Sequence, residues 1–536
     1  MEFFRAYKAD LTRPTYFIES TAPDNVDDTG RMPDLPPEYR KYLKKIEADE
    51  AVEEIAKTLA GSQNPNLVVM VHGFNNPEPA VLKMYLGAAL AIERDKEVKD
   101  REGLVCVGYR WPSERMGQPW QGTWDALPTF PTWLLNAGAV LAVVPFLLLY
   151  LGVVREPIGD HLVTMLGLTL AGLVLTTALL RAIVYFRDTY RATNFGVSDL
   201  VHIIRVIDGK VGELRGSKDY TNDIQLSFIG HSMGGFVVTN TIRVLSDVFE
   251  DGPTRINTYG AAADPSLASR EIGHVFSLKR FVLASPDIPA ETLVTNRSNF
   301  LASALARFDE AYLFSNEGDE VLRQISTLAN YFMFPTKSRN HGFRLGNVEI
   351  LSREFGLLDI PQTDILKRLR IGHLTLQELY DALQYAAEQR QGTMPQGMPK
   401  PPVLLPERFT YFDCTDYTDE WTDPSGKEQP ARPLLTFAKW CKRNDEDARI
   451  PWHSHLRLLL TYLFTQRPNV HGGYFEGLLS QQLIYRLACL GYADTITAYG
   501  GKAALGAACK EKRIRLLVSP ELPGMETEIA SSSTPH

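Results

Sequence analysis

The sequence predicts an α/β protein in which a mostly parallel sheet is flanked by helices. Short apolar runs, which are typical of buried strands, alternate with longer amphipathic segments, and this alternation is the pattern of parallel sheets. Between Asn66 and Arg110 the expected order is strand, helix and strand, at 66–71, 78–95 and 104–110. A second observation is the stretch 227–235, in which an apolar strand leads through a glycine-bounded serine into a helix.

Length and composition narrow the class of protein. The 536 residues exceed one ordinary domain, so one large domain with insertions and two domains are both open. A net charge of -8 without a basic stripe argues against a nucleic-acid partner. The five cysteines are scattered and form no CxxC pair, which indicates neither a disulfide framework nor a zinc site. Neither a P-loop nor a dinucleotide motif occurs, so we expect no cofactor and no metal.

The N-terminal region precedes the first predicted strand. Residues 1–36 are polar and interrupted by prolines, and we expect an irregular arm there. The first residues lack the apolar run of a signal peptide. Apolar residues at helical spacing predict a helix over residues 38–60.

Two long uncharged runs, 133–154 and 162–180, interrupt the alternation. Each is long enough to cross the hydrocarbon of a bilayer, so we predict a two-helix transmembrane hairpin with the lipid bilayer as partner. A buried helical hairpin and an apolar lid are the alternatives. The arginines that flank the hairpin outnumber the single Arg155 of its connecting loop, and the positive-inside rule therefore puts the main domain in the cytoplasm.

The remaining chain returns to the α/β pattern. We expect helices at 194–208 and 235–249, and strands at 224–229, 279–285, 311–315 and 409–413. The predicted organisation is an N-terminal arm and helix (1–60), a first core part (61–132), the hairpin (133–186), a second core part (187–320), a cap-like insertion (321–407), a C-terminal core part with closing helices (408–519) and a disordered tail (520–536).

The motif Gly230-His231-Ser232-Met233-Gly234 and its surroundings resemble the α/β-hydrolase superfamily, in particular its esterase and lipase-like members. The other shared stretches are His72-Gly73-Phe74 after a strand, Gly108-Tyr109-Arg110-Trp111-Pro112-Ser113 on the next, and Ser285-Pro286-Asp287. The resemblance covers roughly residues 67–319 without the hairpin, together with the C-terminal strand and a histidine segment. It leaves out the N-terminal arm and residues 321–407.

The resemblance implies a Ser-Asp-His triad, because a serine hydroxyl needs a base to take its proton and an acid to orient that base. Ser232 is the expected nucleophile. The backbone N–H groups of Met233 and Phe74 are the expected oxyanion donors. In this motif His72 is structural.

The acid and the base each have an alternative. Asp319 follows the strand two after the serine strand and is the expected acid, while Asp287, after the intervening strand, is the alternative. His471 follows the last strand and is the expected base. His455 and His453 are alternatives in the stretch before it, and His341 is a more distant one. The longer stretch between the last strand and His471 departs from the family pattern.

The function implied is a membrane-anchored serine hydrolase that cleaves acyl esters through an acyl-enzyme, with lipids as the expected substrates because of the hairpin. Thioester and amide cleavage would use the same residues. Two alternatives remain open: a catalytically silent membrane scaffold with this fold, and a lipase-type toxin effector. The oligomeric state stays open.

Overall fold

The structure of the protein is a computed structural model. The structure describes residues 1–22, 37–113, 150–151, 165, 168, 172, 183–216, 221–245, 271–293, 300–305, 307–326, 344–350, 358–359, 408–422, 427–437, 450–464, 467–519 and 522.

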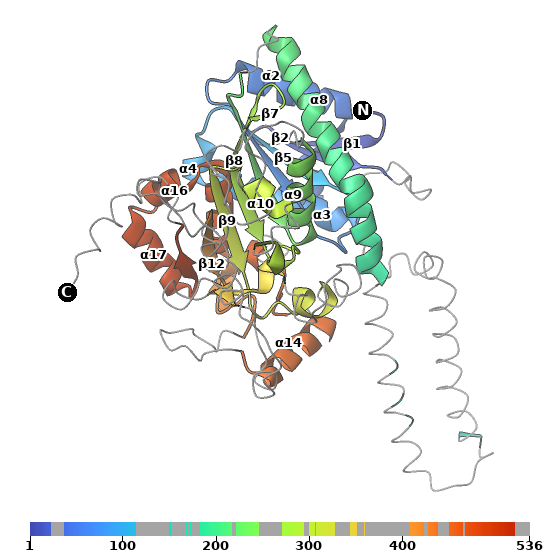
Figure 1. The fold of residues 1–536 in the computed structure, drawn as a ribbon, viewed down its shortest axis with the longest axis vertical. Helices are drawn as coiled ribbons and strands as arrows, with labels where there is room; N and C mark the ends of the chain where they lie inside the picture. Colours follow the sequence, from blue (N-terminus) through green and yellow to red (C-terminus); the bar gives the residue numbers. More distant parts are fainter. Residues whose placement is uncertain are drawn as a thin grey trace, which may run out of the picture.

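A mostly parallel β-sheet runs through the middle of the described residues (Figure 1). Its parallel strands are, in spatial order, β12 (Phe409–Asp413), β9 (Glu310–Ser315), β8 (Phe276–Ala284), β6 (Ile224–His231), β4 (Asn66–Val71), β5 (Leu104–Arg110) and β2 (Thr15–Ser20). The predicted α/β class with a mostly parallel sheet is therefore confirmed. Most of these strands are buried along their whole length, which is why they read as continuous apolar runs.

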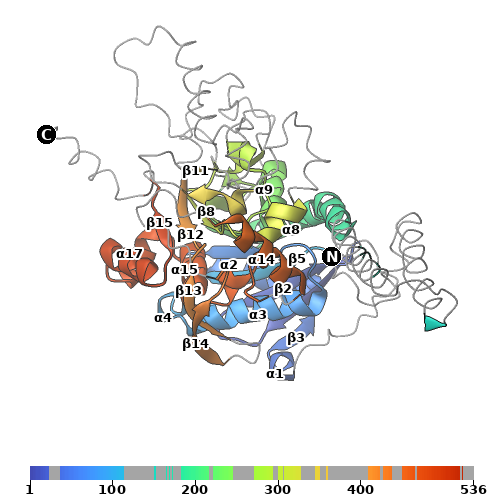
Figure 2. The ribbon, with the colours of Figure 1, turned by 90° about the horizontal axis from the view of Figure 1, so that it is seen from below.

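Helices cover both faces of this sheet, and each face has its own hydrophobic core (Figures 1 and 2). One face carries α2 (Ala48–Gly61), α8 (Val197–Arg215), α9 (Met233–Leu245) and α10 (Phe300–Leu305). The other face carries α3 (Glu78–Arg94), α4 (Lys96–Lys99) and α15 (Leu478–Cys489), with α16 (Tyr492–Ala498) and α17 (Lys502–Glu511) following at the same edge as β12. The described helices that follow β5, β6 and β8 therefore lie on one face of the sheet, and the helix between β4 and β5 lies on the other.

The N-terminal region is part of the sheet, and the prediction of an irregular arm is wrong for residues 1–22. β1 (Phe4–Ala9) pairs antiparallel with both β2 and β3 (Leu43–Ile46). Strand β2 pairs parallel with β5, and all six of its residues are buried. Its apolar run is short and flanked by Glu19 and Ser20, whose polarity is accommodated by partners far along the chain, so local pattern did not reveal it. The predicted helix 38–60 is likewise divided into α1 (Pro37–Arg40), β3 and α2.

Smaller elements complete the described chain. An antiparallel strand, β15 (Arg515–Leu517), closes one edge on β12, and β7 (Glu271–Ile272) pairs with β8. β13 (Thr418–Thr422) and β14 (Glu428–Pro433) form a hairpin, and α14 (Trp452–Phe464) lies beneath the sheet in Figure 1. Figure 2 looks toward α14 from below.

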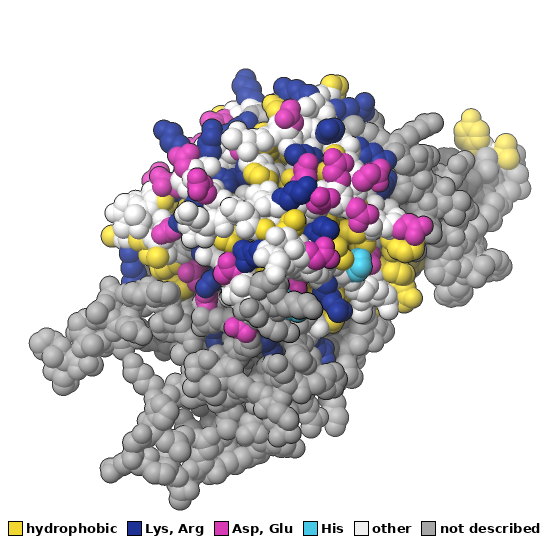
Figure 3. All heavy atoms as spheres, turned by 90° about the horizontal axis from the view of Figure 1, so that it is seen from above, with side chains coloured by type: hydrophobic (Ala, Val, Ile, Leu, Met, Phe, Trp, Pro, Cys, Tyr) yellow, Lys and Arg dark blue, Asp and Glu magenta, His cyan; other side chains and the backbone are white. Residues whose placement is uncertain are grey.

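Over the described part of the face in Figure 3, basic and acidic side chains are interspersed, as on an ordinary solvated surface.

Several predicted segments fall largely on residues that the structure leaves undescribed. The hairpin 133–186 is described only at 150–151, 165, 168, 172 and 183–186, and the tail only at 522. Within the described residues, no helix combines the length and the apolar character that crossing a bilayer requires. Of the cap-like insertion, the structure describes four short elements, η4 (Val321–Ser326), η5 (Leu345–Asn347), β10 (Glu349–Ile350) and β11 (Leu358–Asp359).

A buried cluster of glutamate and arginine side chains ties the N-terminal strands to the sheet. The Glu19 carboxyl group lies 3.5 Å from Arg110 Nη1 and 3.3 Å from Arg5 Nη2, and Arg5 also lies 3.5 Å from Glu78. Glu19 is fully buried. Burial raises the pKa of its carboxyl to about 8, and the nearby Arg110 only partly offsets this.

We predict that this carboxyl makes the protein less stable as the pH rises. Between about pH 4.5 and 8 the folded state keeps a proton on Glu19 that the unfolded chain releases, so stability falls with pH in that window. Glu19→Gln should flatten the fall of Tm, measured by thermal unfolding across this range, whereas the exposed Glu50→Gln should leave it as in the wild type. Equal slopes for wild type and Glu19→Gln would contradict the prediction.

Candidate functional site

Ser232 lies at a sharp turn between β6 and α9. Its φ is 55°, in the left-handed region that costs a serine free energy and that persists only where surrounding contacts enforce it. Its backbone N–H donates to the carbonyl of Ala284 at 3.0 Å, which links the turn to β8. A Cβ at Gly230 would lie 2.7 Å from the backbone of α9, and one at Gly234 would collide with the Val71 carbonyl. Both positions therefore require glycine, because neighbouring backbone approaches them closely. Ser232 lies in the turn between them.

The loop after β4 passes directly beside this serine. A Cβ at Gly73 would lie 2.6 Å from the Cβ of Ser232, so the chain 73–74 can approach only because residue 73 is glycine. No described residue accepts a hydrogen bond from the backbone N–H of Phe74 or of Met233. Met233 is the first residue of α9, where backbone N–H groups are unpaired and the helix dipole is positive. Both predicted oxyanion donors thus belong to backbone segments that meet at Ser232.

Asp319 is held in one orientation at the end of β9. Its Oδ1 accepts from the backbone N–H groups of Val321 and Leu322 at 3.1 and 3.2 Å. Its Oδ2 lies 2.7 Å from Nδ1 of His471 and also accepts from the Ser285 hydroxyl. Asp319 is fully buried. A carboxylate fixed in this way orients the imidazole and favours the tautomer with a proton on Nδ1.

The backbone around His471 is fixed from two sides. Asn316 donates from Nδ2 to the Val470 carbonyl at 2.7 Å. His231, which precedes Ser232, lies with Nε2 3.1 Å from the His471 carbonyl and with its ring centroid 5.0 Å from the His471 ring. Burial lowers the pKa of His231 to about 3, so the ring is neutral and its proton is on Nε2, facing the carbonyl.

Oγ of Ser232 and Nε2 of His471 are buried and have no hydrogen-bond partner among the described residues, and the same holds for Nδ1 of His231. Ser232 Oγ and His471 Nε2 do not hydrogen-bond to each other in this structure. A buried polar atom without a partner is costly, and such atoms are found where a ligand or a reaction uses them. In unliganded enzymes the bond from nucleophile to base is often long and tightens when substrate binds.

Asp287, the alternative acid, is engaged elsewhere. One carboxylate oxygen lies 2.9 Å from Nε of Arg344, and the other accepts from the Ser326 hydroxyl at 3.0 Å. Arg344 and Ser326 belong to the predicted cap-like insertion. The Asp287 carboxylate therefore holds this part of the insertion against the loop that follows β8. The backbone N–H of Asp287 donates to the Ser232 carbonyl at 3.0 Å. The geometry therefore favours Asp319 for the acid.

His455, the alternative base, belongs to α14 and uses both ring nitrogens. Nδ1 lies 2.6 Å from Oε1 of Glu320, and Nε2 accepts from the Arg323 guanidinium at 2.9 Å. Neither nitrogen remains free to take a proton from a serine. The geometry favours His471 for the base.

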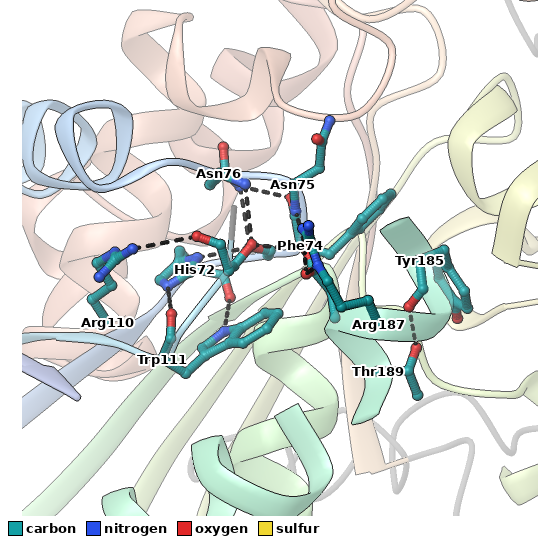
Figure 4. Close-up of polar contacts among 12 residues, drawn as sticks. His72, Phe74, Asn75, Asn76, Arg110, Trp111, Tyr185, Arg187 and Thr189 are labelled. Atoms are coloured by element: carbon teal, nitrogen blue, oxygen red, sulfur yellow. Dashed lines mark hydrogen bonds and ion pairs between the residues drawn. The ribbon is translucent and has the colours of Figure 1, made fainter. Parts of the chain in front are cut away.

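His72 is buried below the loop after β4, as Figure 4 shows. Its Nδ1 lies 2.7 Å from the Gly73 carbonyl, and its ring stacks on Trp111 at 5.1 Å. Burial lowers the pKa of His72 to about 3, which keeps the ring neutral and suits the structural role expected of it.

Sequence reasoning missed four side chains that shape this site, namely His231, Ser285, Asn316 and Asp188. His231 and Ser285 lie within motifs that were recognised, but their partners are distant in the sequence. Asn316 follows the strand before Asp319, and a polar residue there was a usable signal. No local pattern marks Asp188.

Comparisons with protein-family models, with curated proteins and with solved structures found no match for this chain. Among the described residues, no group of three or more histidine, cysteine, aspartate or glutamate side chains could hold a metal ion.

Proposed function

We propose that this protein is a serine hydrolase of the α/β-hydrolase type that cleaves acyl esters through an acyl-enzyme. The observation that carries the proposal is the hydrogen bond between Asp319 and His471 at the strand edge where Ser232 sits in a left-handed turn. These residues come from the ends of different strands and loops, and their types match an orienting acid, a base and a nucleophile. The unpartnered Oγ of Ser232 and Nε2 of His471 support the same assignment.

The proposed reaction proceeds in two steps. In the first, Nε2 of His471 takes the Ser232 hydroxyl proton while Oγ bonds to the ester carbonyl carbon. The negative oxygen that forms accepts hydrogen bonds from the N–H groups of Phe74 and Met233. The bond to the leaving alcohol then breaks, and His471 returns the proton to that alcohol. In the second step His471 takes a proton from a water molecule while the water oxygen bonds to the acyl carbon. The bond from that carbon to Oγ then breaks, the acid leaves, and His471 returns the proton to Oγ of Ser232.

We further propose that the enzyme is anchored in a membrane and acts on lipid esters. The two uncharged runs of the sequence support an anchor, because each is long enough to span hydrocarbon. Three described residues of the predicted hairpin, Tyr150, Leu151 and Leu168, are large, apolar and between 67% and 82% exposed. An anchor of this kind would bring the serine close to substrates that partition into the bilayer.

The proposal is tested by labelling the full chain in detergent with a fluorophosphonate probe, followed by mass spectrometry of the labelled peptide. We expect one adduct, on Ser232, and hydrolysis of acyl glycerol or lysophospholipid esters in mixed micelles. Extraction of membranes with alkaline carbonate should leave the protein in the pellet.

A well-folded wild type that neither labels nor hydrolyses esters would overturn the enzymatic proposal and favour the silent scaffold. An adduct on another serine would overturn the assignment of Ser232. Release by carbonate would overturn the anchor without affecting the chemistry. The substrate panel should include a thioester and an amide of the same acyl chain, because both would react through the same intermediate.

A further inference from the structure

One buried carboxylate outside the proposed triad lies against the loop that carries the Phe74 N–H group. Asp188 belongs to a continuous helical segment, residues 183–215, whose later part is α8. Figure 4 shows this segment beside the loop, with Tyr185 and Arg187 facing Phe74 and Asn75. Asp188 is fully buried. The mechanism proposed above does not use it.

The Asp188 side chain binds backbone N–H groups of the loop. Oδ2 accepts from the Asn75 N–H at 2.8 Å and from the Ser113 hydroxyl at 3.0 Å. Ser113 Oγ in turn accepts from the Asn76 N–H at 3.1 Å. The carboxylate therefore holds two successive N–H groups of the loop, one directly and one through a hydroxyl. Its Oδ1 accepts from Arg187 at 2.9 Å.

The loop has a conformation that needs such support. Asn75 has a φ of 59°, in the left-handed region, which a non-glycine residue adopts at a cost. The Asn76 amide donates to the Gly73 and Phe74 carbonyls at 3.1 and 3.0 Å, which holds those carbonyls on the side of Asn76. Tyr185, one helical turn before Asp188, packs edge-on against the Phe74 ring at 5.4 Å between centroids. The helix thus contacts both the backbone of the loop, at Asn75, and a side chain of the loop, the Phe74 ring.

Burying this carboxylate is unfavourable, and the free energy must be recovered from specific contacts. Burial raises the pKa of Asp188, and Arg187 and the hydrogen bonds from Asn75 and Ser113 act in the opposite direction. A buried carboxylate is tolerated where its oxygens are hydrogen-bonded, so the loop and the carboxylate hold each other in one arrangement.

We propose that Asp188 is a positioning residue, which fixes the 73–76 loop so that the Phe74 N–H stays directed at the oxygen that becomes negative during acyl transfer. This inference rests on the proposed function. It assigns to the helix that follows the predicted hairpin a direct part in shaping the oxyanion site. A displacement of about 1 Å in a catalytic group can lower a rate about 100-fold, which sets the scale of the expected effect.

The test compares Asp188→Ala, Asp188→Asn and Asp208→Ala in the full chain in detergent. Asp208 is a matched control, because it is a buried aspartate of the same helical segment that accepts from the backbone N–H groups of His274 and Val275 at 2.8 and 3.0 Å. It lies roughly 30 Å further along the helix, at 1.5 Å per residue.

We expect Asp188→Ala to lower kcat for an ester about 100-fold with KM changed less than about threefold. The affinity for a trifluoromethyl ketone, which forms a tetrahedral adduct, should fall in proportion to kcat/KM. Amide hydrogen exchange of Asn75 and Asn76 should become faster. Asp188→Asn retains an acceptor for Asn75 and should show a smaller loss. Asp208→Ala should lower Tm but retain kcat.

Wild-type kcat in Asp188→Ala, or an equal loss of kcat in Asp208→Ala, would overturn the inference while the proposed function stands. A rise of KM alone would also overturn it, because a displaced oxyanion donor acts on the transition state. Should Asp188→Ala fail to fold, Asp188→Asn decides by the same measurements. A wild type without activity overturns the proposed function itself. In that case, amide hydrogen exchange at Asn75 that is unchanged in the variants would separately overturn the proposal that Asp188 holds the loop.

Discussion

Replacing Ser232 by alanine is expected to abolish labelling by a fluorophosphonate and to lower kcat by about 10⁶, to the level left by substrate binding and the oxyanion donors. The reason is that the acyl-enzyme cannot form without Oγ, and neither the oxyanion donors nor His471 can replace it. The alanine removes a buried hydroxyl that has no partner among the described residues. Its loss should therefore leave Tm close to the wild-type value. The measurements are gel fluorescence of the labelled protein, initial rates with a lipid ester, and thermal unfolding.

Ser227→Ala is the matched control for this experiment. Ser227 lies on the same strand, β6, and its hydroxyl is also buried and unpartnered among the described residues. The Ser227→Ala variant should be labelled by the fluorophosphonate and should hydrolyse the ester at the wild-type rate. Persisting label in Ser232→Ala would show that another serine reacts, and lost activity in Ser227→Ala would show that any change in β6 disturbs the site.

Asp319→Asn is expected to lower kcat by about 10⁴ while the protein stays folded. In the wild type Oδ2 lies 2.7 Å from Nδ1 of His471, which selects the tautomer whose Nε2 can accept the serine proton. An asparagine can present its NH₂ group to Nδ1 and so favour the opposite tautomer, with the proton on Nε2. The carboxylate would also no longer stabilise the imidazolium that forms during the reaction. Steady-state rates at saturating ester measure the effect.

Asp287→Asn provides the contrast. Asp287 pairs with Arg344 in the interior, and breaking a buried ion pair on one side costs about 3–5 kcal/mol. We expect a clear fall of Tm with kcat within about tenfold of the wild type, because this carboxylate is bound to Arg344 and Ser326. A loss of kcat as large as that of Asp319→Asn would reverse the assignment of the acid.

Much of the fold was predictable because its strands are long, buried and locally apolar. β4, β5, β6, β9 and β12 all begin and end within a few residues of the predicted bounds. Strand β2 was not predictable in this way, because Glu19 and Ser20 give its sequence a polar end. The partners of these two side chains, Arg110 and Asp199, lie far along the chain. Whether a segment of this kind becomes a strand is decided by its pairing with neighbouring strands, here β5 and β1, which the local pattern does not contain.

The site divides in the same way. The strand, turn and helix around Ser232 were identifiable from sequence because these three elements are contiguous in the chain. The choice between Asp319 and Asp287, and between His471 and His455, was open, because each pair satisfies the same order of elements. Packing decides the contacts: Asp319 meets His471 across 152 positions of sequence.

The sequence by itself determined the α/β class, the position of Ser232 and the set of candidates for its partners, because these depend on local periodicity and on residue type. Only the tertiary structure decided which carboxylate meets which histidine, and that Asp188 binds the loop of Phe74. The physical reason is that a buried carboxylate takes whichever donors the fold brings within hydrogen-bonding distance, and those donors lie on strands and helices far apart in the chain.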